Sequence, residues 1–123
     1  MRTTQRKGDI ALTQAVATFT KLGYDISLPI TESAHYDMVV DFKDKLVRVQ
    51  VKYCGTKEVD LRLIHSNSRG YVVKKSKENS YDWLYILEPT GREYLILECL
   101  PGRRSITPNE SMLLERVIKP ALS

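Results

Sequence analysis

The middle of the chain carries its strongest pattern of paired β-structure. Residues 36–42 are mostly apolar, and along residues 46–53 valines alternate with polar side chains. A short charged segment, residues 43–45, separates the two stretches and supplies a turn. Because alternate side chains of a strand point to opposite faces, this pattern predicts a hairpin that buries one face and keeps the other polar. The rest of the chain must be organised around a β-sheet.

Both ends of the chain show helical periodicity instead. Residues 4–22 place apolar side chains three or four positions apart, and Gly23 supplies a stop. Near the other end, Thr107 begins a capping box and residues 112–118 are again periodic. Pro120 predicts the end of this second helix, because proline breaks the helical hydrogen-bond pattern.

Further segments of alternating or apolar character are predicted as strands: residues 24–30, 59–64, 71–74, 81–87 and 93–100. The order of elements is therefore helix, several strands, helix. We find no internal repeat, low-complexity tract or linker. These observations predict one α/β (α+β) domain that spans residues 1–123.

The composition excludes several classes of protein. The 123 residues include 42% hydrophobic and 28% charged residues, as in a folded domain, and the formal net charge is +4. No apolar stretch is long enough to cross a membrane, and residues 1–9 are too polar for a signal peptide. We expect a protein without a membrane partner that is not secreted and resides in the cytoplasm, associated with the nucleoid, or in an organelle.

The cysteines and histidines do not form a metal-binding pattern. Cys54 and Cys99 are far apart and lack a neighbouring cysteine or histidine, so the sequence predicts neither a zinc site nor a disulfide framework. His35 and His65 are the only histidines, and their spacing does not place two imidazoles on one helix face. We therefore do not expect metal chemistry based on histidine.

The hairpin brings three polar side chains together. With a two-residue turn at residues 43–44, Asp37 lies opposite Gln50 and near Lys52, whereas a turn at residues 44–45 places Asp37 opposite Lys52. Either register gathers the same trio, although a three-residue turn without a bulge would separate it. A carboxylate and an amide oxygen are suitable ligands for a hard divalent cation, and an ammonium group can orient a water molecule.

At this point the sequence resembles a known family. An acid on one strand, followed by a short motif ending in lysine on the next, is the pattern of the PD-(D/E)XK nucleases. Four segments are similar, in the same order, to the group I intron-associated homing endonucleases of that family: residues 7–11, 28–32, 36–41 and 48–53. The resemblance extends over roughly residues 6–100. It implies a restriction-endonuclease-like core, with a central mixed sheet, an N-terminal helix and a C-terminal helix.

The resemblance also implies an activity and roles for individual residues. The protein would be a site-specific, Mg²⁺-dependent endonuclease that cleaves double-stranded DNA with a water molecule. Asp37 would be the principal Mg²⁺ ligand, Gln50 a second ligand and Lys52 the residue that positions the water. Gln50 stands where most PD-(D/E)XK enzymes have an acid, although glutamine is typical of this sub-family. Asp9 would be the compensating catalytic and metal-binding acid, with Glu32 as the alternative.

Asp9 has a second interpretation that needs no chemistry. Seven residues advance a helix by about 700°, so Asp9 lies within about 20° of Val16 and close to the apolar stripe. Alternatively, the helix begins later than Thr4 and Asp9 caps its start. The sequence leaves both interpretations open.

Basic residues occur in several clusters suited to phosphate contacts. The candidates for DNA binding are Arg6, Lys7, Arg62, Arg69, Lys74, Lys75, Lys77, Arg103 and Arg104. Because one site cuts one strand, cleavage of both strands implies a homodimer or homotetramer. The helix over residues 112–118 would provide an assembly face or pack on its own sheet.

Two other functions are compatible with the same fold. A structure-specific nuclease of the Holliday-junction resolvase type would share the core but would not need a specific sequence. A DNA-binding module that has lost catalysis is the third candidate, since a neutral Gln50 would also be expected there. The retention of Asp37 and Lys52 argues against this last interpretation.

Overall fold

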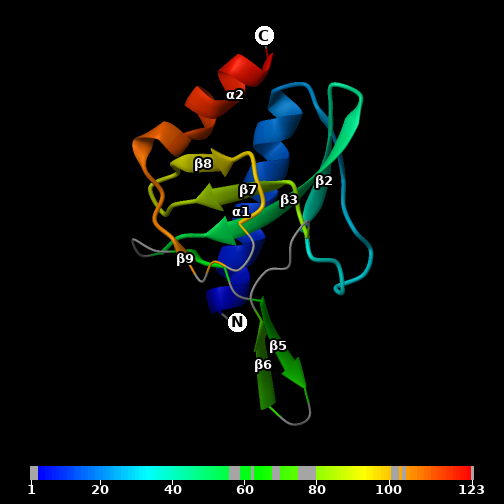
Figure 1. Cartoon of the computed structure of the whole chain (residues 1–123), viewed down its shortest axis with the longest axis vertical. Helices are drawn as coiled ribbons and strands as arrows, with labels where there is room; N and C mark the ends of the chain where they lie inside the picture. Colours follow the sequence, from blue (N-terminus) through cyan, green and yellow to red (C-terminus); the bar gives the residue numbers. More distant parts are fainter. Residues whose placement is uncertain are drawn as a thin grey trace.

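A mixed five-stranded sheet forms the centre of the protein (Figure 1). The structure is a computed structural model that describes residues 3–55, 59–61, 63–67, 70–74, 80–100, 103 and 105–122. The strand order is β1-β2-β3-β7-β8, in which β3 and β7 are parallel and the other neighbours antiparallel. This arrangement confirms the predicted mixed sheet with an N-terminal and a C-terminal helix.

The helices are α1 (Thr3–Lys21), the 3-10 helix η1 (Glu110–Met112) and α2 (Leu114–Leu122), and the strands are β1 (Asp25–Ser27), β2 (Met38–Phe42), β3 (Lys45–Tyr53), β4 (Val59–Asp60), β5 (Leu63–Asn67), β6 (Gly70–Lys74), β7 (Trp83–Leu87), β8 (Glu93–Ile96) and β9 (Ser105–Ile106). Outside the central sheet, β4 pairs with β9 and β5 pairs with β6.

The β2–β3 hairpin has the first of the two predicted registers. Phe42 pairs with Lys45, which leaves a two-residue turn, and Met38 pairs with Val49. Both turn residues, Lys43 and Asp44, have positive φ, at 48° and 65°. This conformation matches the right-handed twist of the strands, and it explains how a turn without glycine still fixes the register.

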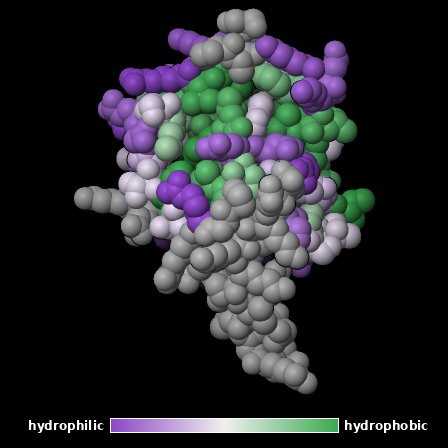
Figure 2. Space-filling view, in the orientation of Figure 1, coloured by the Kyte–Doolittle hydropathy of each residue, from purple (hydrophilic) through white to green (hydrophobic). Residues whose placement is uncertain are grey.

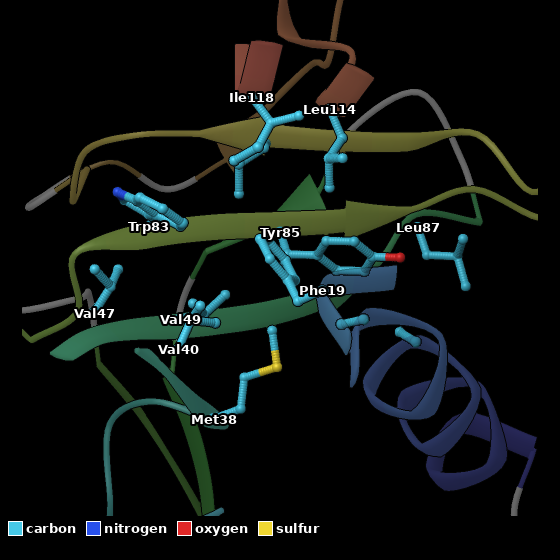
Figure 3. Packing of buried hydrophobic residues seen from close by; sticks show 13 residues of the cluster. Phe19, Met38, Val40, Val47, Val49, Trp83, Tyr85, Leu87, Leu114 and Ile118 are labelled. Carbon is cyan, nitrogen blue, oxygen red and sulfur yellow. The ribbon is translucent and has the colours of Figure 1, made fainter. Parts of the chain in front are cut away.

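Helix α1 covers one face of the sheet and lies behind it in Figure 1. Its fully buried residues, Ala11, Ala15 and Phe19, are four positions apart and so share one face. They pack in one cluster with the valines of β3 and with Tyr85 of β7, and Figure 3 shows Phe19 beside Tyr85. After the helix, Gly23 takes a φ of 95°, the conformation expected of a helix-stopping glycine.

A second hydrophobic cluster covers part of the opposite face. It joins Leu84 and Ile86 of β7 with Tyr94 and Ile96 of β8, and adds residues from the later loops and from β4 and β9. Seen from this side, hydrophobic patches lie over the sheet with hydrophilic side chains around and between them (Figure 2). Strand β7 is therefore buried on both faces along its whole length.

The C-terminal region differs from the prediction in three ways. Asn109, and not Thr107, caps the first turn, because its side chain accepts a hydrogen bond from the Ser111 N–H. Leu113 then leaves the helical path to bridge Tyr94, so one predicted helix becomes η1 and α2. Helix α2 also continues past Pro120 to Leu122, since a proline in the last turn removes only one hydrogen bond.

The apolar side of α2 packs on its own sheet. Leu114 and Ile118 are buried against the same cluster as α1 and point toward β8 and β7 in Figure 3. Of the two predicted roles of this helix, the intramolecular one is confirmed. These two side chains are not available to a second subunit.

Several strand boundaries also differ from those predicted. The segment 24–30 pairs only over Asp25–Ser27, and the segment 93–100 ends its pairing at Ile96. The segment 59–64 contributes to two separate strands, β4 and β5, and the short strand β9 was not predicted. The pairing of β4 with β9 joins Val59 to Ile106, and periodicity alone cannot identify a partner so distant in sequence.

Burial in the cluster under α1 predicts a difference between two positions of that helix. Phe19 has no exposed surface, whereas Ile10 is 46% exposed. We expect Phe19→Ala to lower the free energy of unfolding by about 3–5 kcal/mol, because it leaves a cavity between the helix and the sheet. Ile10→Ala should change it by no more than about 0.5 kcal/mol. Urea unfolding followed by circular dichroism measures both, and equal effects would contradict the assigned packing.

Candidate active site

The predicted trio starts at the entrance to β2. The Asp37 N–H donates to the Val49 carbonyl at 2.9 Å, and the pairing of β2 with β3 begins at the next residue, Met38, which is also opposite Val49. On β3 the valines face α1, so Gln50 and Lys52 point to the other face. The hairpin alone therefore positions these side chains.

At the end of the β2–β3 ladder, the Asp37 carboxylate accepts a backbone hydrogen bond in place of a strand carbonyl. Its Oδ2 accepts a hydrogen bond from the Val51 N–H at 2.7 Å and another from the Gln50 Nε2 at 3.2 Å. One bond comes from the backbone of β3 and one from the neighbouring side chain. The carboxylate is thus held in one orientation before any ligand binds.

The surroundings of Asp37 oppose its ionisation. Burial raises the pKa of this carboxyl above its ordinary value, although the Val51 N–H and the positive charge of Lys52 both act to lower it. Lys52 is thus close enough for its charge to act on Asp37. A divalent cation bound beside Asp37 would stabilise the ionised carboxylate further, because an opposite charge nearby favours the charged form.

The donor set fits a small, hard cation. Asp37 provides carboxylate oxygens and Gln50 provides an amide oxygen, and Mg²⁺ commonly takes one or two carboxylates and completes its shell with water and substrate phosphates. In the structure the Gln50 amide points its NH₂ group at Asp37, so its oxygen faces away. To bind the same cation as Asp37, this amide would have to turn over.

The two predicted additional acids are located differently. Asp9 lies on α1 and Glu32 on the loop before β2, and both are exposed. Neither joins Asp37 in a larger acidic cluster, since no group of three or more Asp, Glu, His or Cys side chains comes together in the described part of the chain. Because Asp9 lies inside α1, the alternative in which it caps the helix is wrong.

The orientation of α1 nevertheless turns Asp9 toward the β2 side of the sheet. Thr18 donates a hydrogen bond to Glu93 of the edge strand β8 at 2.5 Å. Nine residues turn a helix by about 900°, so Asp9 lies on the opposite side of α1 from Thr18. Lys7, in the same turn as Asp9, places its Nζ 5.7 Å from the ring centre of Tyr53, the last residue of β3. The first turns of α1 therefore lie at the end of β3 that follows Lys52.

The predicted DNA contacts are only partly described. Arg6 and Lys7 are exposed on the first turns of α1, and Arg103 is exposed on the loop before β9. Lys74 is the last residue of β6. The remaining candidates lie outside the described residues: Arg62, Arg69, Lys75, Lys77 and Arg104.

Comparison with known proteins identifies the family. A model of the PD-(D/E)XK endonuclease family matches residues 2–98, from the start of α1 to just beyond β8. The chain belongs to the PD-(D/E)XK endonuclease family. This confirms the resemblance seen in the sequence and makes the protein an enzyme that hydrolyses phosphodiester bonds in DNA. PD-(D/E)XK nucleases generally use a divalent metal.

A solved structure supports the same family. The chain is similar to a bacterial homing endonuclease, I-Ssp6803I, with a TM-score of 0.72 and 26% sequence identity. The similarity covers 89% of this chain and 80% of the other. No curated protein sequence matches the chain significantly. Among the described residues, no helix has both the length and the apolar character of a membrane span.

The raised pKa of Asp37 predicts that the ionised carboxylate, the form that binds a cation, lowers the stability of the folded protein. In the folded protein this carboxyl is harder to ionise than in the unfolded chain, so its ionisation costs stability, and the full cost is present above the folded pKa. We expect Asp37→Asn to unfold at a higher temperature than the parent at pH 7 without metal. The difference should shrink as the pH falls through the raised folded pKa, and it should be gone below the ordinary carboxyl pKa.

Thermal unfolding between pH 3 and pH 8 measures this difference. Asp41→Asn is the matched control, because Asp41 is an exposed acid on β2, the strand that Asp37 directly precedes. Added divalent metal should raise the unfolding temperature of the parent and of Asp41→Asn, but not that of Asp37→Asn. A lower unfolding temperature for Asp37→Asn at pH 7 would show that burial does not dominate at this carboxyl.

Proposed function

We propose that the protein is a Mg²⁺-dependent endonuclease of the homing type, which cleaves double-stranded DNA at a specific site. The observation that carries the proposal is the contact of Asp37 with Gln50, with Lys52 beside them, in a PD-(D/E)XK chain. The similarity to a bacterial homing endonuclease supports the homing type.

In this proposal each member of the trio has one task. Asp37 and the amide oxygen of Gln50 hold the cation, which when bound polarises the scissile phosphate and lowers the pKa of a bound water. Lys52 donates a hydrogen bond that orients the attacking water and stabilises negative charge on the phosphate. Its charge also favours the ionised form of Asp37, which is the form that binds a cation.

We propose Asp9 as the additional acid of the site. It lies on the side of α1 turned away from β8, and the neighbouring Lys7 contacts the end of β3. A single carboxylate balances only half of the charge of Mg²⁺, so a second acid would strengthen metal binding. Glu32, on the loop that leads into Asp37, is the alternative.

The mode of cleavage implies an assembly. We propose a homodimer or homotetramer, since a subunit of one domain with one site cuts one strand at a time. The proposed DNA contacts include Arg6, Lys7 and Arg103, which are exposed. Lys7 contacts Tyr53 at the end of β3, the strand that carries Gln50 and Lys52.

A cleavage assay tests the function directly. Supercoiled plasmid, a duplex with an intron-insertion-type target and a four-way junction are incubated with and without Mg²⁺. We expect discrete Mg²⁺-dependent cuts in duplex DNA, and a loss of about 100-fold or more in rate for Asp37→Ala and Lys52→Ala. DNA binding by both variants should persist, because neither change removes more than a small part of the phosphate contacts.

The control is Lys43→Asn, which removes a cation at the far end of the same hairpin and suits the positive φ of that residue. It should cleave like the parent. Asp9→Asn and Glu32→Gln in the same assay identify the additional acid. Cleavage of the junction alone would favour a resolvase, and DNA binding without any cleavage would favour a module that has lost catalysis.

Gln50 gives a separate prediction about metal binding. Gln50→Glu places a second carboxylate beside Asp37, where the amide now donates a hydrogen bond. We expect the metal-free variant to be less stable than the parent, because two close carboxylates repel each other. We also expect it to bind divalent metal more tightly and to gain more stability from it.

Thermal unfolding over a series of Mg²⁺ concentrations measures this effect. Gln14→Glu is the matched control, because it adds the same charge on α1 near Thr18, away from the trio. Its metal dependence should equal that of the parent. A variant Gln50→Glu that responds to Mg²⁺ no more than the parent would mean that Gln50 does not reach the cation.

A further inference from the structure

An ion-paired arginine lies on the same strand face as the trio. Arg48 is two residues before Gln50 on β3, so its side chain points to the same face. Lys52 is two residues after Gln50. Along this face of β3 the order is therefore cation, amide, cation, with about 6–7 Å between successive positions.

Asp82 fixes the guanidinium of Arg48. Its Oδ2 accepts from the Arg48 Nε at 3.2 Å, and its Oδ1 accepts from the Arg48 Nη2 at 3.2 Å. The parallel pairing of Val49 with Trp83 explains the contact, because it sets the two preceding residues side by side. The hydrogen bonds to Asp82 raise the pKa of Arg48 still further, so its positive charge is permanent.

A structural role does not require this side chain. The Arg48 N–H already donates to the Asp82 Oδ2 at 2.9 Å, and the Asp82 N–H donates to the Arg48 carbonyl at 2.8 Å. These two bonds join β3 to the start of β7 whatever side chain stands at position 48. The guanidinium pair adds an oriented cation to a junction that the backbone already holds.

Part of the guanidinium remains available to a ligand. The Arg48 side chain is 34% exposed, and the pair with Asp82 uses Nε and Nη2. Within the described residues, Nη1 has no hydrogen-bond partner. An arginine held along one edge by a carboxylate presents its other edge in a fixed direction, and this geometry suits a phosphate group.

We infer that Arg48 is a further DNA-binding residue of the active site, and that it binds a backbone phosphate of the strand that lies across Gln50. Asp82 is its positioning residue. The inference rests on the proposed function, because it takes the trio as the place where DNA is cut. Two cations on either side of Gln50 would also offset the repulsion between Asp37 and the incoming phosphates.

The salt dependence of DNA binding tests the inference. Fluorescence anisotropy of a labelled 20–30 base-pair duplex, without divalent metal and over a series of KCl concentrations, gives the slope of log K against log salt. Loss of one phosphate contact lowers the magnitude of this slope by about 0.9, which corresponds to roughly five- to tenfold weaker binding at 0.1 M salt. We expect this change for Arg48→Gln and for Arg48→Met, which keeps the apolar stem.

The control and the positioning variant separate this role from a structural one. Arg116 of α2 forms an exposed ion pair with Glu110 of η1. The variant Arg116→Gln removes this arginine and should leave the salt slope of DNA binding unchanged. Asp82→Asn keeps the cation and loosens its orientation, so the slope should persist while the cleavage rate falls. If instead Arg48→Gln, Arg48→Met and Asp82→Asn all lower the unfolding temperature without changing the slope, the pair is structural and the inference is overturned.

The proposed function can fail independently. If the parent cleaves duplex DNA but Arg48→Gln and Arg48→Met keep its salt slope, only the role of Arg48 is wrong. If the parent neither cleaves nor binds duplex DNA, the proposed function fails and this inference fails with it.

Discussion

The hydrogen bond from the Val51 N–H to the Asp37 carboxylate is the contact on which the site depends. It closes the β2–β3 ladder at the point where the chain enters β2, so it belongs to both the sheet and the proposed chemistry. A shift of the hairpin by one residue would exchange the two faces of β3 and turn the valines away from α1. The packing of those valines therefore keeps Asp37 in contact with Gln50, and the carboxylate in turn satisfies a backbone donor that has no partner on β2 there.

Strand β3 divides its side chains between stability and function. Val47 and Val49 are buried under α1, while Gln50 and Lys52 lie on the opposite face and are half-buried. The next strand, β7, is buried on both sides, so the sheet becomes rigid immediately beside the trio. A site built on such a scaffold keeps its geometry even though one of its members, Asp37, is held where burial makes its charge unfavourable.

Local signals made the hairpin predictable, and distant pairings limited the rest. Alternation and a charged turn were sufficient to gather Asp37, Gln50 and Lys52, because the strands that carry them are adjacent in the sequence. The same reasoning could not find Arg48 as a partner of Asp82, since their contact depends on the parallel pairing of β3 with β7, 34 residues further along. The break in the C-terminal helix has the same origin, because Leu113 leaves the helix to bridge Tyr94 of β8.

The presence of a glutamine at position 50 follows from the electrostatics of Asp37. Burial already raises the pKa of that carboxyl, and a second carboxylate in contact with it would favour a shared proton over two charges when no cation is bound. An amide avoids this conflict, because its NH₂ group stabilises the ionised Asp37 before metal binding. The same amide, once turned over, offers an oxygen to a cation. The amide leaves the site with one negative charge fewer than a second carboxylate would supply, and the proposed acid at Asp9 would restore that charge from outside the hairpin.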